Sequence, residues 1–176
     1  MFKQSDTNNE SIFINLKTNQ TNMTMKTSEE LKNIVSIGDL NQIKSLIGEI
    51  KALSTENQED IVAGSVILKY NDIFKYFIEN DLPINAKDSE SKTPVLIHAI
   101  RNHDLELAKF MIANTVNIHD TDAYGNSALM EAVSERNNIE EIIPVLIANG
   151  ADLDQKNDSG ISPREYAENF DYDLPE

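Results

Sequence analysis

The sequence predicts an all-α protein made of repeated helix pairs, and two observations support that prediction. From Ser28 onward, apolar residues recur three and four positions apart in successive short stretches, which is the spacing of one helix face. The polar loops between these stretches match one another, with 34 residues from Thr93 to Ser127 and 35 from Ser127 to Ser162. A fixed period of this length is typical of repeat architectures, in which each unit packs on its neighbours.

The pattern divides the chain into a polar start, four helix pairs and a short cap. Residues 1–27 are dominated by Ser, Thr, Asn and Gln, cannot bury enough apolar area to offset chain entropy, and are predicted to be flexible. Pro144 lies inside the second helix of the fourth pair, which it should kink or delay. The expected units are 28–57, 58–91, 92–126 and 127–161, with the cap at 162–176.

The ends of the helices carry recognisable turn and capping residues. Gly150 follows the second helix of the fourth pair, where a left-handed residue commonly ends a helix. Asp81 and Thr115 stand at the same place in earlier pairs, and Thr suits that conformation poorly because it is β-branched. Thr93-Pro94 and Ser162-Pro163 each predict a helix start with a hydroxyl cap and proline at the first helical position.

Taken together, these residues resemble ankyrin repeats. The likeness rests on the period, the Gly150-Ala151-Asp152 ending, the Thr93-Pro94 opening, and Gly125 and Gly160 at expected hairpin tips. The T-P-L-H-x-A pattern of the family reads here Thr93-Pro94-Val95-Leu96-Ile97-His98-Ala99, which is one residue too long. The resemblance implies a helical solenoid with hairpin loops that binds other proteins, and a structural role for His98 in the turn network.

The resemblance also implies a partner-binding surface, because the hairpin tips and first helices of ankyrin arrays line a concave face. Glu131 and Glu135 are expected to be exposed there. Tyr124 is expected either to anchor a partner or to pack on the neighbouring hairpin. The expected partner-binding residues are Ser89, Glu90, Lys92, Arg101, Tyr124, Asn126, Glu131, Ser134, Glu135 and Ser159.

A formal charge of −15 argues against nucleic acid and anionic membranes as partners, since both require clustered Lys and Arg. From His119 onward 14 acidic residues stand against 3 basic ones, a net of −11, which suits either solubility or a basic partner. The favoured function is a non-enzymatic module that binds a basic protein through an acidic concave face, with an immunity protein or antitoxin as one form. The alternatives are an effector of a parasite or virus that binds a host protein, and a regulatory subunit or fragment of an enzyme.

Other classes of function find little support in the sequence. The chain has no cysteine, and no apolar stretch of secretory or membrane-spanning length, so a cytoplasmic monomer is expected. The segment from Asp120 to Glu131 has the acidic spacing of a calcium loop, but Tyr124 replaces an oxygen ligand and a repeat hairpin explains the same residues. No catalytic residue, metal site or cofactor is predicted.

Overall fold

The computed structural model describes residues 26–135, 141–171 and 173–174. The predicted flexible segment, residues 1–27, lies outside these ranges except for its last two residues. Within them the chain forms nine helices and no strand, so the predicted all-α repeat fold is confirmed. The helices are α2 (Ser28–Ile37), α3 (Leu40–Lys51), α4 (Thr55–Ile67), α5 (Asn71–Glu79), α6 (Val95–Arg101), α7 (Leu105–Ala113), α8 (Ala128–Ser134), α9 (Ile142–Ala148) and α10 (Pro163–Asn169).

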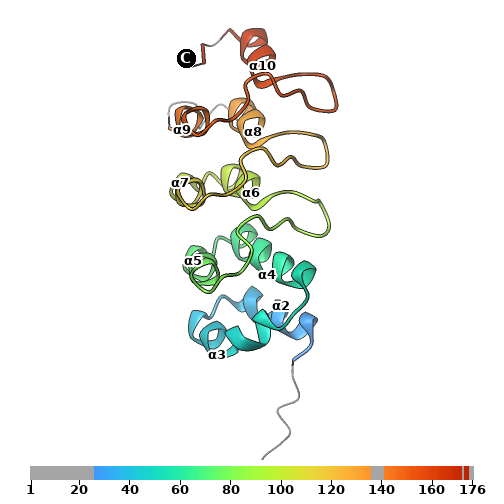
Figure 1. The fold of residues 1–176 in the computed structure, drawn as a ribbon, viewed down its shortest axis with the longest axis vertical. Coiled ribbons are helices and arrows are strands. Elements are labelled where there is room, and N and C mark those ends of the chain that lie inside the picture. Colours follow the sequence, from blue (N-terminus) through green and yellow to red (C-terminus); the bar gives the residue numbers. More distant parts are fainter. Residues whose placement is uncertain (1–25, 136–140, 172, 175–176) are drawn as a thin grey trace, which may run out of the picture.

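The helices stack in two layers (Figure 1). α4, α6, α8 and α10 form the inner layer, which α2 extends by packing on α4, while α3, α5, α7 and α9 form the outer layer. One continuous apolar core lies between the layers, because each helix turns its apolar face toward the other layer. Phe74 and Phe110 join two neighbouring outer helices edge to face, with ring centroids 6.4 Å apart.

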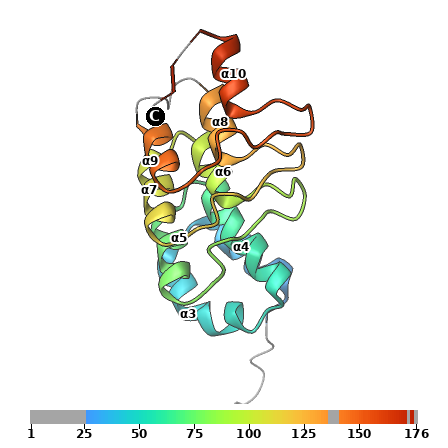
Figure 2. The ribbon, with the colours of Figure 1, turned by 45° about the horizontal axis from the view of Figure 1, so that its top comes forward.

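Three hairpin loops project from the side of the inner layer and lie one above the next (Figure 2). We refer to residues 87–94, 121–127 and 156–162 as the first, second and third hairpins. The first is one residue longer than the second, since its isolated bridge joins Lys87 to Pro94 while that of the second joins Thr121 to Ser127. The extra residue seen in the Thr93-Pro94 motif is therefore absorbed in the loop.

The helix caps follow the sequence closely, with one correction. Ser162 forms the predicted capping box with Glu165, and Pro163 occupies the first turn of α10. Pro144 lies in the first turn of α9, which begins only at Ile142, as a delayed start requires. The expectation that Thr93 caps α6 is wrong, because Pro94 holds the cap position and the longer hairpin places Thr93 one residue earlier.

The connection between the first two helix pairs differs from the others, because it has no hairpin. α3 ends at Lys51 and α4 begins at Thr55, so only residues 52–54 join them. α4 has 13 residues, whereas α6 has 7, and the additional length extends α4 at its N-terminal end. The first turns of α4 thus take the place that a hairpin takes before each later inner helix.

Each outer helix from α5 to α9 is followed by a left-handed residue: Asp81 (φ 63°), Thr115 (φ 65°) and Gly150 (φ 91°). We expect Thr115→Gly to stabilise the protein by about 1 kcal/mol, because a β-branched residue is strained in this conformation. Asp81→Gly should gain less, since Asp tolerates left-handed backbone better. Urea unfolding of the two variants measures the difference, and an unchanged or lower stability of Thr115→Gly would show that its backbone stores no strain.

Candidate partner-binding surface

Each hairpin is organised by an Asp or Asn side chain that accepts backbone amides of its own turn. Asp122 Oδ1 accepts from the amides of Tyr124 (2.9 Å) and Asn126 (3.0 Å). Asn157 Oδ1 accepts in the same way from Ser159 and Ile161, and Asp88 Oδ1 from Glu90 and Ser91. Asp and Asn favour this arrangement because their short side chains reach amides two or more residues on. The turn conformations are therefore fixed by these side chains.

Arg101 links the second hairpin to two inner helices. Its Nη2 donates to Asp122 Oδ2 and to Glu131 Oε2, both at 2.8 Å. The prediction that Glu131 is exposed is wrong: it is only 8% exposed, because Arg101 of the preceding repeat covers it. Arg101 and Glu131 thus serve first as an internal link between repeats.

The hairpin carboxylates are held ionised by their surroundings. Burial raises the pKa of Asp122, but hydrogen bonds from the Tyr124 and Asn126 amides and from Arg101 outweigh it, so that pKa lies below its usual value. Burial likewise raises the pKa of Asp88, and hydrogen bonds from Ser91 and His98 hold it well below its usual range. His98 Nε2 lies 2.9 Å from Asp88 Oδ2, which confirms its predicted place in the turn network.

Neighbouring hairpins are bonded to one another. Between the second and third, the Asp158 amide donates to the Tyr124 carbonyl (3.0 Å) and Asn157 Nδ2 donates to Asn126 Oδ1 (2.8 Å). Lys87 of the first hairpin pairs with Asp120 beside the second at 3.3 Å. The second and third hairpins are thus bonded near their tips, and the first is joined to the second at its base. We call the three hairpins the platform, and Asn126 contributes to its construction.

Most of the other residues predicted to bind a partner are accessible. Tyr124 has 72% of its surface exposed, so it does not pack on the neighbouring hairpin. Glu135 is half-buried, with its carboxylate 4.0 Å from His103 Nε2. Ser134 is half-buried and donates to the Glu131 carbonyl. The exposed residues at the hairpin tips are Ser89, Glu90, Lys92 and Ser159.

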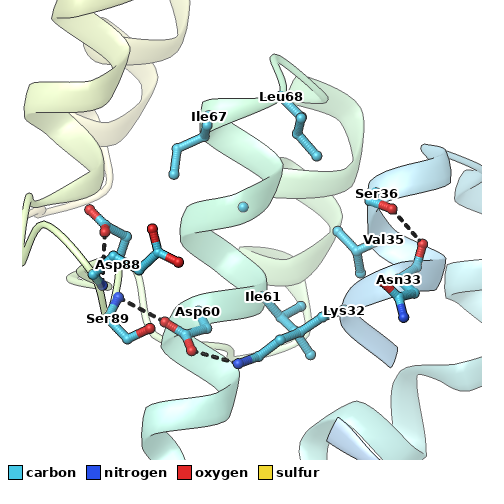
Figure 3. Close-up of a pocket in the computed structure, with 12 residues that line it drawn as sticks. Lys32, Asn33, Val35, Ser36, Asp60, Ile61, Ile67, Leu68, Asp88 and Ser89 are labelled. Atoms are coloured by element: carbon cyan, nitrogen blue, oxygen red, sulfur yellow. Dashed lines mark hydrogen bonds and ion pairs between the residues drawn. The ribbon is translucent and has the colours of Figure 1, made fainter. Parts of the chain in front are cut away.

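The structure also shows a pocket that the sequence did not indicate, between α2, α4 and the first hairpin (Figure 3). Its volume is about 390 Å³. Asp60 of α4 connects its three sides, since its Oδ2 accepts from Lys32 Nζ of α2 (2.7 Å) and its Oδ1 from the Ser89 amide (2.9 Å). Ile67, the last residue of α4, and Leu68, its C-cap, form an apolar wall at that end of the pocket, and each is 43% exposed. Ser89 and Glu90 are the only expected binding residues that line the pocket.

The pocket exists because α4 differs from later inner helices at two positions. Counted back from the C-caps Leu68, Asn102 and Glu135, Gly64 takes the place of His98 and Glu131. A side chain at Gly64 would have no atom within 4 Å of its Cβ, so the space above it is open. By the same count Ile67 stands where α6 carries Arg101, and it does not cross to the hairpin as Arg101 does.

The part of the chain that the structure describes carries neither a candidate metal site nor a helix able to span a membrane. It holds no group of three or more His, Cys, Asp or Glu residues placed to bind a metal ion. The two oxygens of Asp122, a ligand in the calcium-like spacing, are engaged by turn amides and Arg101. Among the same residues, no helix has the length and apolar character needed to cross a membrane.

Stacked helix pairs with bonded hairpins along one side define a repeat scaffold of the kind that holds other proteins. The family model for ankyrin repeats, in three copies, matches residues 31–157. The chain belongs to the ankyrin-repeat family. Ankyrin repeats generally bind protein partners, and their fold is typically a non-enzymatic interaction scaffold.

One solved structure illustrates the likeness of fold. The ankyrin repeat domain of Bcl-3, described as a unique member of the IkappaB protein family, matches with a TM-score of 0.56 and 24% sequence identity. The match covers 60% of this chain and 46% of that chain, and at this identity it concerns the fold alone. A comparison with curated proteins found no match.

Proposed function

We propose that the chain holds a basic protein against the side formed by its hairpin tips and inner helices. The observation that carries this proposal is Tyr124, an exposed aromatic residue on a platform of hairpins that are bonded to one another. Aromatic side chains give large contact area for little conformational entropy, and a fixed backbone lowers the entropy that binding removes.

The charge of the chain supports a basic partner. The formal net charge of −15 creates a field that speeds the approach of a cationic protein and discourages anionic ones. The acidity of the inner side itself is moderate, because Lys32 and Arg101 pair with Asp60, Asp122 and Glu131. Glu90 and Asp158 lie exposed at the hairpin tips, where a partner would meet them. An immunity protein or antitoxin that masks a basic toxin is one form of this function, in a cytoplasmic and monomeric protein.

The proposal is tested by capture with the full chain and with two charge-matched variants. Glu90→Lys changes a hairpin tip, whereas Glu79→Lys makes the same change on α5 of the outer layer, and both positions are exposed. We expect the captured protein to be basic, to bind more weakly as salt is raised, and to lose roughly fivefold in affinity with Glu90→Lys only.

The control decides which side of the array is used. Weaker binding with Glu79→Lys and unchanged binding with Glu90→Lys would place the partner on the outer layer. If binding does not weaken as salt is raised, the acidic residues of the surface serve solubility and do not attract the partner.

A further inference from the structure

We infer that the pocket between α2, α4 and the first hairpin receives an arginine side chain of the protein partner. The inference rests on the proposed function, because it assumes that a basic protein approaches the inner side. It adds the chemistry of one contact: an aliphatic stem that lies along α4 and a guanidinium group that meets carboxylates at the pocket mouth.

The apolar wall suits the stem of such a side chain. Ile67 and Leu68 lie exposed at the C-terminal end of α4 (Figure 3), and the missing side chain at Gly64 leaves the floor between them and Asp60 open. Long cationic side chains bury their methylene groups against apolar surface while the charged end stays among polar groups. A wholly apolar side chain would leave the Glu90 carboxylate at the pocket mouth without a partner.

The charge around the pocket suits the guanidinium. Three carboxylates line it, those of Asp60, Asp88 and Glu90, against one ammonium, that of Lys32. Lys32 is engaged by Asp60 at 2.7 Å, and Asp88 is engaged by its own turn and by His98. Glu90 is exposed and forms no ion pair with any other residue that the structure describes, so its carboxylate is open to a bidentate guanidinium.

The next repeat shows what this place in the array accommodates. There the chain supplies its own arginine, Arg101, which crosses from α6 to Asp122 of the hairpin and to Glu131 of α8. In the repeat that forms the pocket the corresponding residue is Ile67, so the arginine must come from outside. Arginine fits better than lysine because its planar group can satisfy two acceptors at once, as Arg101 does.

The test uses the ¹⁵N-labelled full chain and three small probes: N-acetyl-arginine amide, the neutral isostere N-acetyl-citrulline amide, and N-acetyl-lysine amide. We expect the arginine probe to shift the amide signals of Gly64, Ser89 and Glu90 saturably, with a dissociation constant on the order of 1 mM for a ligand of this size. The lysine probe should bind severalfold more weakly, and the citrulline probe should leave these signals unchanged.

Gly64→Leu fills the pocket, and Gly48→Leu is its control. Neither position has an atom within 4 Å of an added Cβ, and Gly48 lies on α3 away from the pocket. Both variants should melt no lower than the parent, since leucine favours a helix more than glycine does. Only Gly64→Leu should abolish the shifts of the amide signals with the arginine probe. It should also lower the affinity for the captured partner about tenfold.

Any of three results would overturn the inference: equal responses to arginine and citrulline, a response that survives Gly64→Leu, or pocket signals that respond to none of the probes. The pocket and the proposed function can fail separately. If binding of the partner is weakened by Glu90→Lys but not by Gly64→Leu, the partner still binds the inner side of the array and does not use the pocket.

Discussion

Arg101→Met is expected to lower the free energy of unfolding by roughly 3 kcal/mol, because it leaves two poorly solvated carboxylates without their cation. The side chains of Asp122 and Glu131 are only 2% and 10% exposed, and both lose a 2.8 Å hydrogen bond. Arg164→Met is the matched control, since Arg164 pairs with Asp154 at 2.8 Å where both side chains are largely exposed. That change should cost less than about 1 kcal/mol. Urea unfolding measures both.

At low pH, the difference in free energy of unfolding between Arg101→Met and the parent should become smaller. In the parent the pKa of Asp122 lies below its unfolded value, so its contribution is fully present above about pH 4 and is lost as pH falls through the lower pKa of the folded state. In the variant the part of that contribution that comes from Arg101 is missing, while the hydrogen bonds from the Tyr124 and Asn126 amides remain, so the stabilities of the two proteins should approach each other at low pH. Adding Glu131→Gln to Arg101→Met should recover part of the loss at neutral pH. A constant deficit, or no recovery, would show that packing of the Arg101 stem matters more than its charge.

Tyr124→Ala is expected to weaken binding of the captured partner by about 2 kcal/mol, or roughly 30-fold in affinity, mainly through a faster off-rate. The melting temperature should not change, because the side chain is largely exposed and the bonds of its backbone to Asp122 and Asp158 remain. Surface plasmon resonance at two salt concentrations separates this effect from electrostatic steering, which acts on the on-rate.

Two further variants sharpen the Tyr124 experiment. Tyr124→Phe keeps the ring and should retain most of the affinity unless the hydroxyl donates a hydrogen bond. Ser159→Ala alters an exposed position on the next tip and should have little effect. If Tyr124→Ala leaves the off-rate unchanged, the hairpin platform is not where the partner is held.

The helices of this fold could be predicted from the sequence because the patterns that indicate them, apolar spacing and capping residues, are local. Apolar spacing located the helix pairs, and capping residues such as Ser162 fixed where a helix begins. The left-handed conformation of Thr115 could be predicted because its loop aligns with that of Gly150. The Thr93 cap failed for a physical reason: one extra residue in a hairpin shifts the helix start without altering the motif.

The binding surface was harder to predict from the sequence, because it depends on contacts between residues that are far apart in the chain. Glu131 looked like a solvated helix residue, and only the approach of Arg101, 30 residues earlier, makes it an internal one. Ile67 is an apolar residue within a helix, yet the structure exposes it beside Leu68. Three consecutive apolar residues, Val66 to Leu68, cannot all face one side of a helix, and that was the available signal. The space above Gly64 depends on which helices flank it, which spacing alone does not reveal.

The short α3–α4 connection affects how firmly the α2–α3 pair is attached to the rest of the array. Without a hairpin, the α2–α3 pair is attached through helix packing and a few side-chain bonds, such as Lys32 to Asp60 and the Tyr70 hydroxyl to the Ser36 carbonyl. Among the described helix pairs, α2–α3 packs on one neighbour, and a repeat with one neighbour opens at lower free energy than a repeat with two. Any ligand that touches both α2 and α4 binds only the closed form, so it adds RT ln(1 + [L]/Kd) to the free energy of opening. A ligand in the pocket should therefore slow hydrogen exchange in α2, because both depend on the equilibrium between the closed and open forms of the α2–α3 pair.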